Sequence, residues 1–190
     1  MSAPSVEYNG LIFAETFGDL AYTMYSHAVS LRDLGCTQSP MNAWITLNGV
    51  ETLPLRFGKR HCSNGLAVAE FLEKHQNVDW VSHAGLKSSP YYKLGKKYFP
   101  NGTGSLFAFG VKGGYESGLK LLESVELFSH VANLGDTRSL ILHPASTTHR
   151  QLTEEQRIAA SAGPEVVRLS VGIECAEDLI ADLEQALNKL

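Results

Sequence analysis

The chain has 190 residues, of which 44% are hydrophobic and 19% charged, and its formal net charge is −4. This length suits one domain, or one domain with an arm, and the composition can build a hydrophobic core. The small negative charge gives no electrostatic reason to expect nucleic acid or an anionic membrane as a partner.

The spacing of the cysteines and the composition of the N-terminus indicate the cellular compartment of the protein. Cys36, Cys62 and Cys175 are widely spaced and form no CxxC motif, which favours a reducing environment over a disulfide framework. Residues 1–10 have neither the basic nor the apolar region of a signal peptide, and no stretch approaches the roughly 18 apolar residues of a membrane span. We therefore expect a soluble protein of the cytoplasm.

Residues 1–36 are predicted to form an N-terminal arm, an interface segment that precedes the body of the chain at 37–190. Dense apolar positions crowd a short helical stretch of this arm, and such a surface needs a partner, either the body or another subunit. These positions are Leu11, Ile12, Phe13, Phe17, Leu20, Ala21 and Tyr25.

Beyond the arm, Ser39 and Pro40 are a helix-start signal. A long helical segment follows to about His75, and Pro54 and Gly58 are expected to kink or divide it. Strands are then predicted at 78–83, 105–111, 128–131, 140–142 and 166–174. Helices are predicted at 91–99, 118–124, 153–162 and 176–190.

This alternation predicts an α/β or α+β layered domain, in which helices cover a face of a sheet of three to five strands. At the helix predicted for 153–162, Thr153 is expected to be the N-cap and Gln156 to complete a capping box.

Arg168 lies in the middle of a β-branched strand. A buried guanidinium is costly without an anionic partner, and one held on a strand can grip a carboxylate with two parallel hydrogen bonds. Two interpretations stay open on local grounds: an internal salt bridge, for example to Glu174, or a site for a ligand carboxylate.

Two polar loops follow predicted strands. The segment 133–136, Asn-Leu-Gly-Asp, is either an ordinary turn or a place where the Asn133 amide and nearby N–H groups meet an anion. The segment 143–149 is rich in hydroxyl groups and suits the mouth of a substrate site. Its two histidines share no helical face and lack a third ligand, which argues against zinc.

Taken in order, six segments closely resemble the C-terminal half of the Cys/Met-metabolism family of pyridoxal-phosphate (PLP) enzymes of fold type I, and within it the O-acetylhomoserine sulfhydrylases. The resemblance covers essentially the whole chain. The segments are 39–43, 51–56, 109–114, 129–136, 143–149 and the strand that contains Arg168.

The resemblance implies a C-terminal small domain, with a small, mostly antiparallel sheet that is covered by helices and preceded by a long kinked helix. It implies that Arg168 binds the α-carboxylate of an amino-acid substrate, that Asn133 assists it and that Thr148 lines the pocket. The implied reaction, part of methionine biosynthesis, replaces the acetate of O-acetylhomoserine by sulfide, with PLP as electron sink. O-Succinylhomoserine and O-acetylserine stay open as substrates.

The family's PLP-binding lysine, phosphate-binding loop and pyridinium-pairing aspartate belong to its N-terminal half, and no lysine segment here resembles the Schiff-base motif. The resemblance thus implies that this chain alone does not hold PLP covalently, and that its partner is the N-terminal PLP-binding half or a full-length paralogue. We also expect a homo-oligomer.

Two other functions remain open. The chain could be a non-catalytic truncated paralogue that binds amino acids or joins an oligomer. Alternatively, it could be a generic α+β domain in which Arg168 forms only a structural ion pair.

Overall fold

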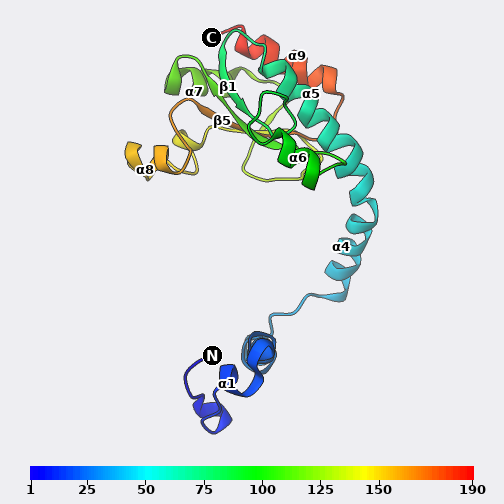
Figure 1. The fold of residues 1–190 in the computed structure, drawn as a ribbon, viewed down its shortest axis with the longest axis vertical. Coiled ribbons are helices and arrows are strands. Elements are labelled where there is room, and N and C mark those ends of the chain that lie inside the picture. The colour runs from blue at the N-terminus through cyan, green and yellow to red at the C-terminus, as the bar shows by residue number, and fades with distance from the viewer. The chain divides into compact units, whose positions relative to one another are not determined.

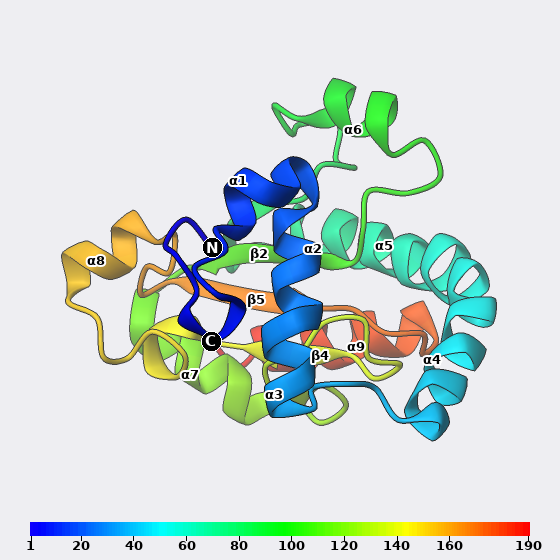
Figure 2. The same cartoon turned by 90° about the horizontal axis from the view of Figure 1, so that it is seen from below.

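Five strands form one sheet in the computed structural model, which describes residues 1–190. Their order is β1-β2-β5-β4-β3, and every pairing is antiparallel except that of β3 with β4. Figure 2 shows β2, β5 and β4 side by side. The predicted small, mostly antiparallel sheet is confirmed. The strands are β1 (Val78–Ser82), β2 (Leu106–Val111), β3 (Ser129–His130), β4 (Leu140–Leu142) and β5 (Val166–Ser170).

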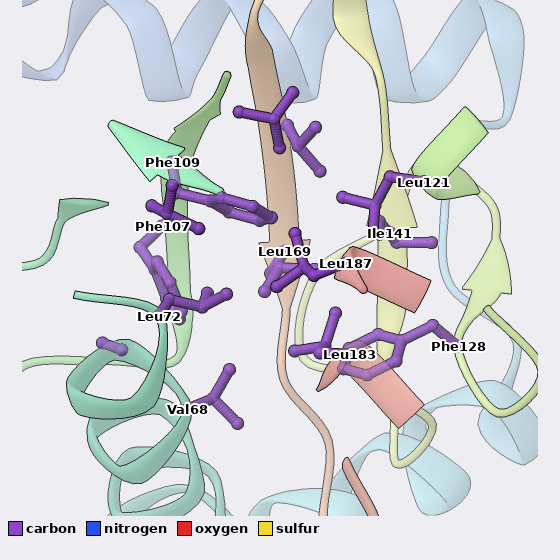
Figure 3. Close-up of a cluster of buried hydrophobic side chains, with 14 of the residues drawn as sticks. Val68, Leu72, Phe107, Phe109, Leu121, Phe128, Ile141, Leu169, Leu183 and Leu187 are labelled. Atoms are coloured by element: carbon purple, nitrogen blue, oxygen red, sulfur yellow. The ribbon is translucent and has the colours of Figure 1, made fainter. Parts of the chain in front are cut away.

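Three helices, α5 (Cys62–Leu72), α7 (Gly114–Ser124) and α9 (Ala176–Leu187), cover one face of the sheet (Figure 1). Because side chains alternate along a strand, Val167 and Leu169 of β5 point into the core beneath these helices. Figure 3 shows Leu169 among aromatic and aliphatic side chains of β2, α5 and α9. Burial of each such side chain stabilises the fold by about 1.5–3 kcal/mol.

The long helical segment is divided as predicted at Pro54. An α-helix, α4 (Pro40–Leu53), begins where the Asn42 amide donates to Ser39 Oγ at 3.2 Å. It leads into a π-helical stretch, η4 (Pro54–His61), and then into α5. The π-helix starts at the proline because that residue has no N–H to continue the α-helical ladder.

The predicted element ends need some correction. Helix α7 begins at Gly114, four residues before the predicted start, because the positive φ angles of Gly113 and Gly114 turn the chain directly from β2 into the helix. Helix α8 (Glu154–Ala159) has the predicted capping box between Thr153 and Gln156 but ends earlier than expected. The remaining short helices are α6 (Tyr92–Tyr98) and η5 (Pro144–Ser146).

Contacts divide the chain into two units, Met1–Val50 and Glu51–Leu190. The first unit has a small aromatic core, in which Phe13 is buried edge-on against the rings of Tyr8 and Tyr25 at 5.4 and 5.1 Å. Its helical stretch is a series of short helices. They are η1 (Val6–Tyr8), α1 (Phe13–Phe17), η2 (Gly18–Leu20), α2 (Ala21–Tyr25), η3 (Ser26–Leu31) and α3 (Arg32–Leu34).

Helix α4 mixes apolar and polar residues around its axis, and none of its residues is buried. Trp44 and Leu47 are 61% and 62% exposed. Exposed large apolar side chains that gather on one helix are typical of a surface that contacts another protein segment. No helix of the chain is both long enough and apolar enough to cross a bilayer.

One buried carboxylate organises the approach to β3. Asp182 of α9 is 7% exposed and accepts hydrogen bonds from the amides of Glu126, Leu127 and Phe128 at 2.8–3.2 Å. We expect Asp182→Ala to lower the free energy of unfolding by about 2–3 kcal/mol, because these N–H groups lose their acceptor. Urea denaturation measures this. Glu184→Ala, at an exposed position of the same helix, should change the value by about 0.5 kcal/mol or less.

A buried histidine makes stability depend on pH. Burial lowers the pKa of His83 below its ordinary value of 6.5, although its hydrogen bond to the Gly104 carbonyl acts in the opposite direction. The unfolded state then binds the proton more readily, so the stabilisation is complete above about pH 6.5 and is lost as pH falls through the folded-state pKa. We expect unfolding free energy to fall more steeply from about pH 7.5 to about pH 5.5 in the wild type than in His83→Asn. Equal slopes in the two proteins would contradict this.

Candidate functional site

Arg168 lies at the centre of the sheet on the face opposite the helices that cover the core. Its register partners are Ala108 on β2 and Leu142 on β4. The alternation that sends Val167 and Leu169 into the core places the half-buried guanidinium on the other face. Two flanking strands therefore hold this side chain on a rigid platform.

The guanidinium has no anionic partner in the chain. Arg168 Nη2 donates to the Asn133 carbonyl at 3.3 Å, and no carboxylate lies within salt-bridge distance. The Glu174 carboxylate instead accepts from the amide of Ser139 at 2.6 Å and from its hydroxyl at 2.9 Å. The interpretation of Arg168 as half of an internal ion pair is therefore wrong, and its remaining N–H groups are available to an external acceptor.

The turn at 133–136 lies beside this arginine. Asn133 Oδ1 accepts from the Leu134 amide at 2.8 Å, so the side chain shapes its own turn while its NH₂ group has no protein partner. Gly135, at φ +73°, completes the bend. Asp136 pairs with Arg138 at 3.1 Å, and hydrogen bonding from Arg138 lowers the pKa of the Asp136 carboxyl. That carboxylate is thus engaged locally and does not neutralise Arg168.

Thr148 is not brought into contact with Arg168. It is exposed, and its hydroxyl lies 2.8 Å from His149 Nδ1. Its loop is anchored at His143, which is fully buried and bonds Ser146 Oγ and the Pro164 carbonyl at 2.9 and 2.8 Å. The chain contains no cluster of three residues suited to a metal ion. The structure therefore brings Arg168 and Asn133 together and leaves Thr148 apart from them.

A groove of about 750 Å³ opens on the same face of the sheet as Arg168. Ala108, the β2 register partner of Arg168, is part of its lining. The indole of Trp80 lies across Gly110, where a Cβ atom would come within 2.3 Å of Nε1. Helix α8 contributes Ile158. The face of the sheet that carries Arg168 thus also has an aromatic platform, which lies on β1, two strands from β5.

Sequence reasoning missed three buried polar residues behind the site, namely His61, Asn64 and Ser139. The only local signal was a histidine and an asparagine spaced three apart on one helix, which places both on the same face. The hydrogen-bond partners of His61 and Asn64 lie more than 100 residues further along the chain. Nothing near these two residues in the sequence therefore reveals their role.

Comparison with known proteins identifies the lineage of this architecture. The family model described as "Cys/Met metabolism PLP-dependent enzyme" matches residues 7–188. An O-acetyl-L-homoserine sulfhydrylase of Leptospira meyeri is 46% identical over 98% of the chain, and a homocysteine synthase of Schizosaccharomyces pombe is 45% identical over 97%. The chain spans 44% and 43% of these relatives, which is less than half of their length.

A solved structure agrees with the sequence matches. A Campylobacter jejuni protein described as an O-acetylhomoserine (thiol)-lyase superposes with a TM-score of 0.85 and 40% identity. The match covers 98% of this chain and 44% of that one. That protein contains a pyridoxyl-lysine phosphate.

The residues of this chain do not fit covalent attachment of that cofactor. A Schiff-base lysine needs a desolvated site that lowers its pKa. Every lysine of the chain is exposed, Lys96 and Lys97 of α6 among them, and these two lie over tyrosine rings at the surface. The chain thus combines an arginine that has no carboxylate partner with lysines that are all exposed.

Because Arg168 forms no ion pair in the chain, its charge should be dispensable for folding. We expect Arg168→Met to change the free energy of unfolding by less than about 1 kcal/mol, whereas loss of one partner of a buried ion pair costs about 3–5 kcal/mol. Chemical denaturation of the two proteins at equal concentration measures the difference. A loss in the larger range would restore the structural interpretation of this arginine.

Proposed function

Because this chain belongs to the Cys/Met metabolism PLP-dependent enzyme family, we propose that it supplies the substrate-carboxylate site of an O-acetylhomoserine sulfhydrylase. The reaction would convert O-acetylhomoserine and sulfide into homocysteine and acetate. The observation that carries this proposal is the Arg168 guanidinium, which is fixed on a central strand and has no carboxylate partner in the chain.

In this proposal Arg168 receives the α-carboxylate of the amino acid through charge-assisted hydrogen bonds. The Asn133 carbonyl already orients one edge of the guanidinium, and the free Asn133 NH₂ group is a further donor beside it. A carboxylate held by a rigid pair of this kind fixes the position of the adjacent Cα, which lowers the entropic part of the barrier. Thr148 would approach only if its loop changes conformation.

The cofactor would be held by polypeptide outside these 190 residues, since the exposed lysines of this chain offer it no covalent site. Helix α4 supports this arrangement, because its exposed apolar side chains suit a protein surface that is absent here. We propose that α4 packs against the part of the relatives that this chain does not span. The three free cysteines suit the cytoplasm as the location.

A second function has its own support. The absence of a desolvated lysine is also what a non-catalytic module would show, one that binds amino acids or joins the oligomer of a full-length paralogue. Both functions use Arg168 to bind a carboxylate, and only the first requires turnover. An assay of turnover therefore separates them.

The test combines the chain with the N-terminal half of a homologous sulfhydrylase loaded with PLP, and follows homocysteine formation from O-acetyl-L-homoserine and sulfide. We expect activity in the mixture and neither in the chain nor in the half alone. Arg168→Ala should lower kcat/KM by about 100-fold or more, because the carboxylate loses a charge-assisted contact and its orientation. The control is Lys120→Ala. Lys120 is an exposed residue of α7, on the side of the sheet opposite Arg168, and its loss should leave the rate unchanged.

Inactivity of every mixture, with co-purification of the chain and a full-length paralogue, would favour the non-catalytic module. O-Succinyl-L-homoserine and O-acetyl-L-serine, assayed in parallel, identify the acyl group and chain length that the site prefers.

A further inference from the structure

A buried polar cluster lies behind the carboxylate site and begins in the π-helix η4. His61, the last residue of η4, is fully buried, and its ring stacks on Phe57 with centroids 4.8 Å apart. Phe57 in turn lies against the 133–136 turn, because a Cβ atom on Gly135 would be 3.2 Å from its ring. Helix η4 therefore touches the turn that carries Asn133.

His61 also reaches the strand that carries Arg168. Its Nδ1 donates to the carbonyl of Val171, three residues after Arg168, at 2.8 Å. Its Nε2 is buried without any hydrogen-bond partner. A buried unsatisfied nitrogen costs free energy, and an apolar side chain of similar volume would avoid that cost. The imidazole is therefore poorly explained as simple core packing.

Asn64 and Ser139 extend the same cluster. Asn64 Nδ2 donates to the carbonyls of Gly172 and Glu174 at 3.1 and 2.8 Å. Ser139 Oγ donates to the Glu174 carboxylate at 2.9 Å and accepts from the Gly172 amide at 2.8 Å. The Thr137 carbonyl accepts from Ile173 N at 3.0 Å. Residues 171–174 are thus bonded on one side to η4 and α5, and on the other to residues 137–139.

The two halves of the carboxylate site end in this cluster. Arg168 leads into Val171 along β5, and the Asn133 turn leads into Ser139. Each half has its own contact with η4, the first through His61 and the second through Phe57. Besides the direct hydrogen bond from Arg168 to the Asn133 carbonyl, contacts with η4 therefore also constrain the two segments that carry these residues.

We propose that His61 is a positioning residue, which holds the end of β5 and the 133–136 turn at a constant separation so that Arg168 and Asn133 face one carboxylate together. This role rests on the proposed function, because it assumes that a substrate carboxylate occupies the site. His61 acts only through other residues and does not touch the substrate. Partners of this kind determine how tightly a correctly chosen ligating group binds.

Two variants at one position separate positioning from packing. His61→Leu keeps the volume and removes the donor to Val171. His61→Asn shortens the side chain and retains an N–H at the position of Nδ1. NMR follows the Arg168 Nε–H signal and the amide signals of residues 134–139 in the wild type and in both variants. Hydrogen exchange is measured at the same amides. We expect His61→Leu to shift and broaden these signals and to accelerate exchange at 134–139, and His61→Asn to restore them.

Titration with O-acetyl-L-homoserine adds a functional measurement. We expect His61→Leu to weaken its binding about tenfold, in the range seen when a residue that orients a ligand group is lost, and His61→Asn to recover most of the affinity. If His61→Leu does not fold, Phe57→Leu tests the same connection from the side of the turn and should disturb residues 134–139 alone.

The outcomes are distinguishable. A folded His61→Leu protein with wild-type exchange at 134–139 and an unchanged Arg168 signal overturns the positioning role, whatever happens to its melting temperature. Equal affinity of the wild type and His61→Leu for O-acetyl-L-homoserine also overturns it. If the wild-type chain does not bind this ligand, the proposed function fails, while the NMR measurements still decide whether His61 holds the two segments together.

Discussion

The central strand of a two-layer domain must satisfy two environments at once, and this requirement governs the whole of Glu51–Leu190. One side of β5 supplies Val167 and Leu169 to the core beneath α5, α7 and α9, and the other side presents Arg168. Hydrogen bonds to β2 and β4 lock the strand register, so the backbone of Arg168 cannot shift without moving the core residues beside it. The packing that stabilises the core therefore also holds the backbone of the Arg168 site in place.

Partial burial of the Arg168 charge without an anionic partner raises the free energy of the folded chain, which an uncharged residue at this position would avoid. The chain keeps nearby carboxylates away from it in specific ways. Asp136 is paired with Arg138, and Glu174 is bonded by Ser139. Each of these two acids is engaged by a donor other than Arg168. This arrangement leaves the guanidinium available to an anion that comes from outside the chain.

Helix α4 and the cluster around His61 also contain groups that lack a partner within this chain. Helix α4 exposes large apolar side chains such as Trp44 and Leu47, and His61 buries an unpartnered nitrogen. Neither feature lowers the free energy of this chain by itself. Each becomes intelligible if the chain works as part of a larger protein, in which α4 is covered and the position of the Arg168 strand matters for binding. The relatives, which are more than twice as long as the matched region, are consistent with that arrangement.

Elements with strong local signals could be predicted from the amino-acid sequence. Thr153 and Gln156 form the predicted capping box, Pro54 divides the long helical segment, and the β-branched run around Arg168 is a strand. Ordered motifs also identified the family, because motif order is a property of sequence alone. Helix ends were less accurate where paired glycines start a helix, as at Gly113 and Gly114.

The partners of the charged and buried polar groups, in contrast, became known only from the folded structure. The local sequence does not reveal whether Glu174 pairs with Arg168 or with Ser139. Glu174 is near Arg168 in the sequence, whereas Ser139 comes close to Glu174 only when the chain folds. His61 and Val171 are 110 residues apart in sequence, and their hydrogen bond forms because folding brings the end of η4 to the residue that follows β5. Periodicity and capping act over a few residues, whereas a buried hydrogen bond depends on which distant surfaces the core brings together.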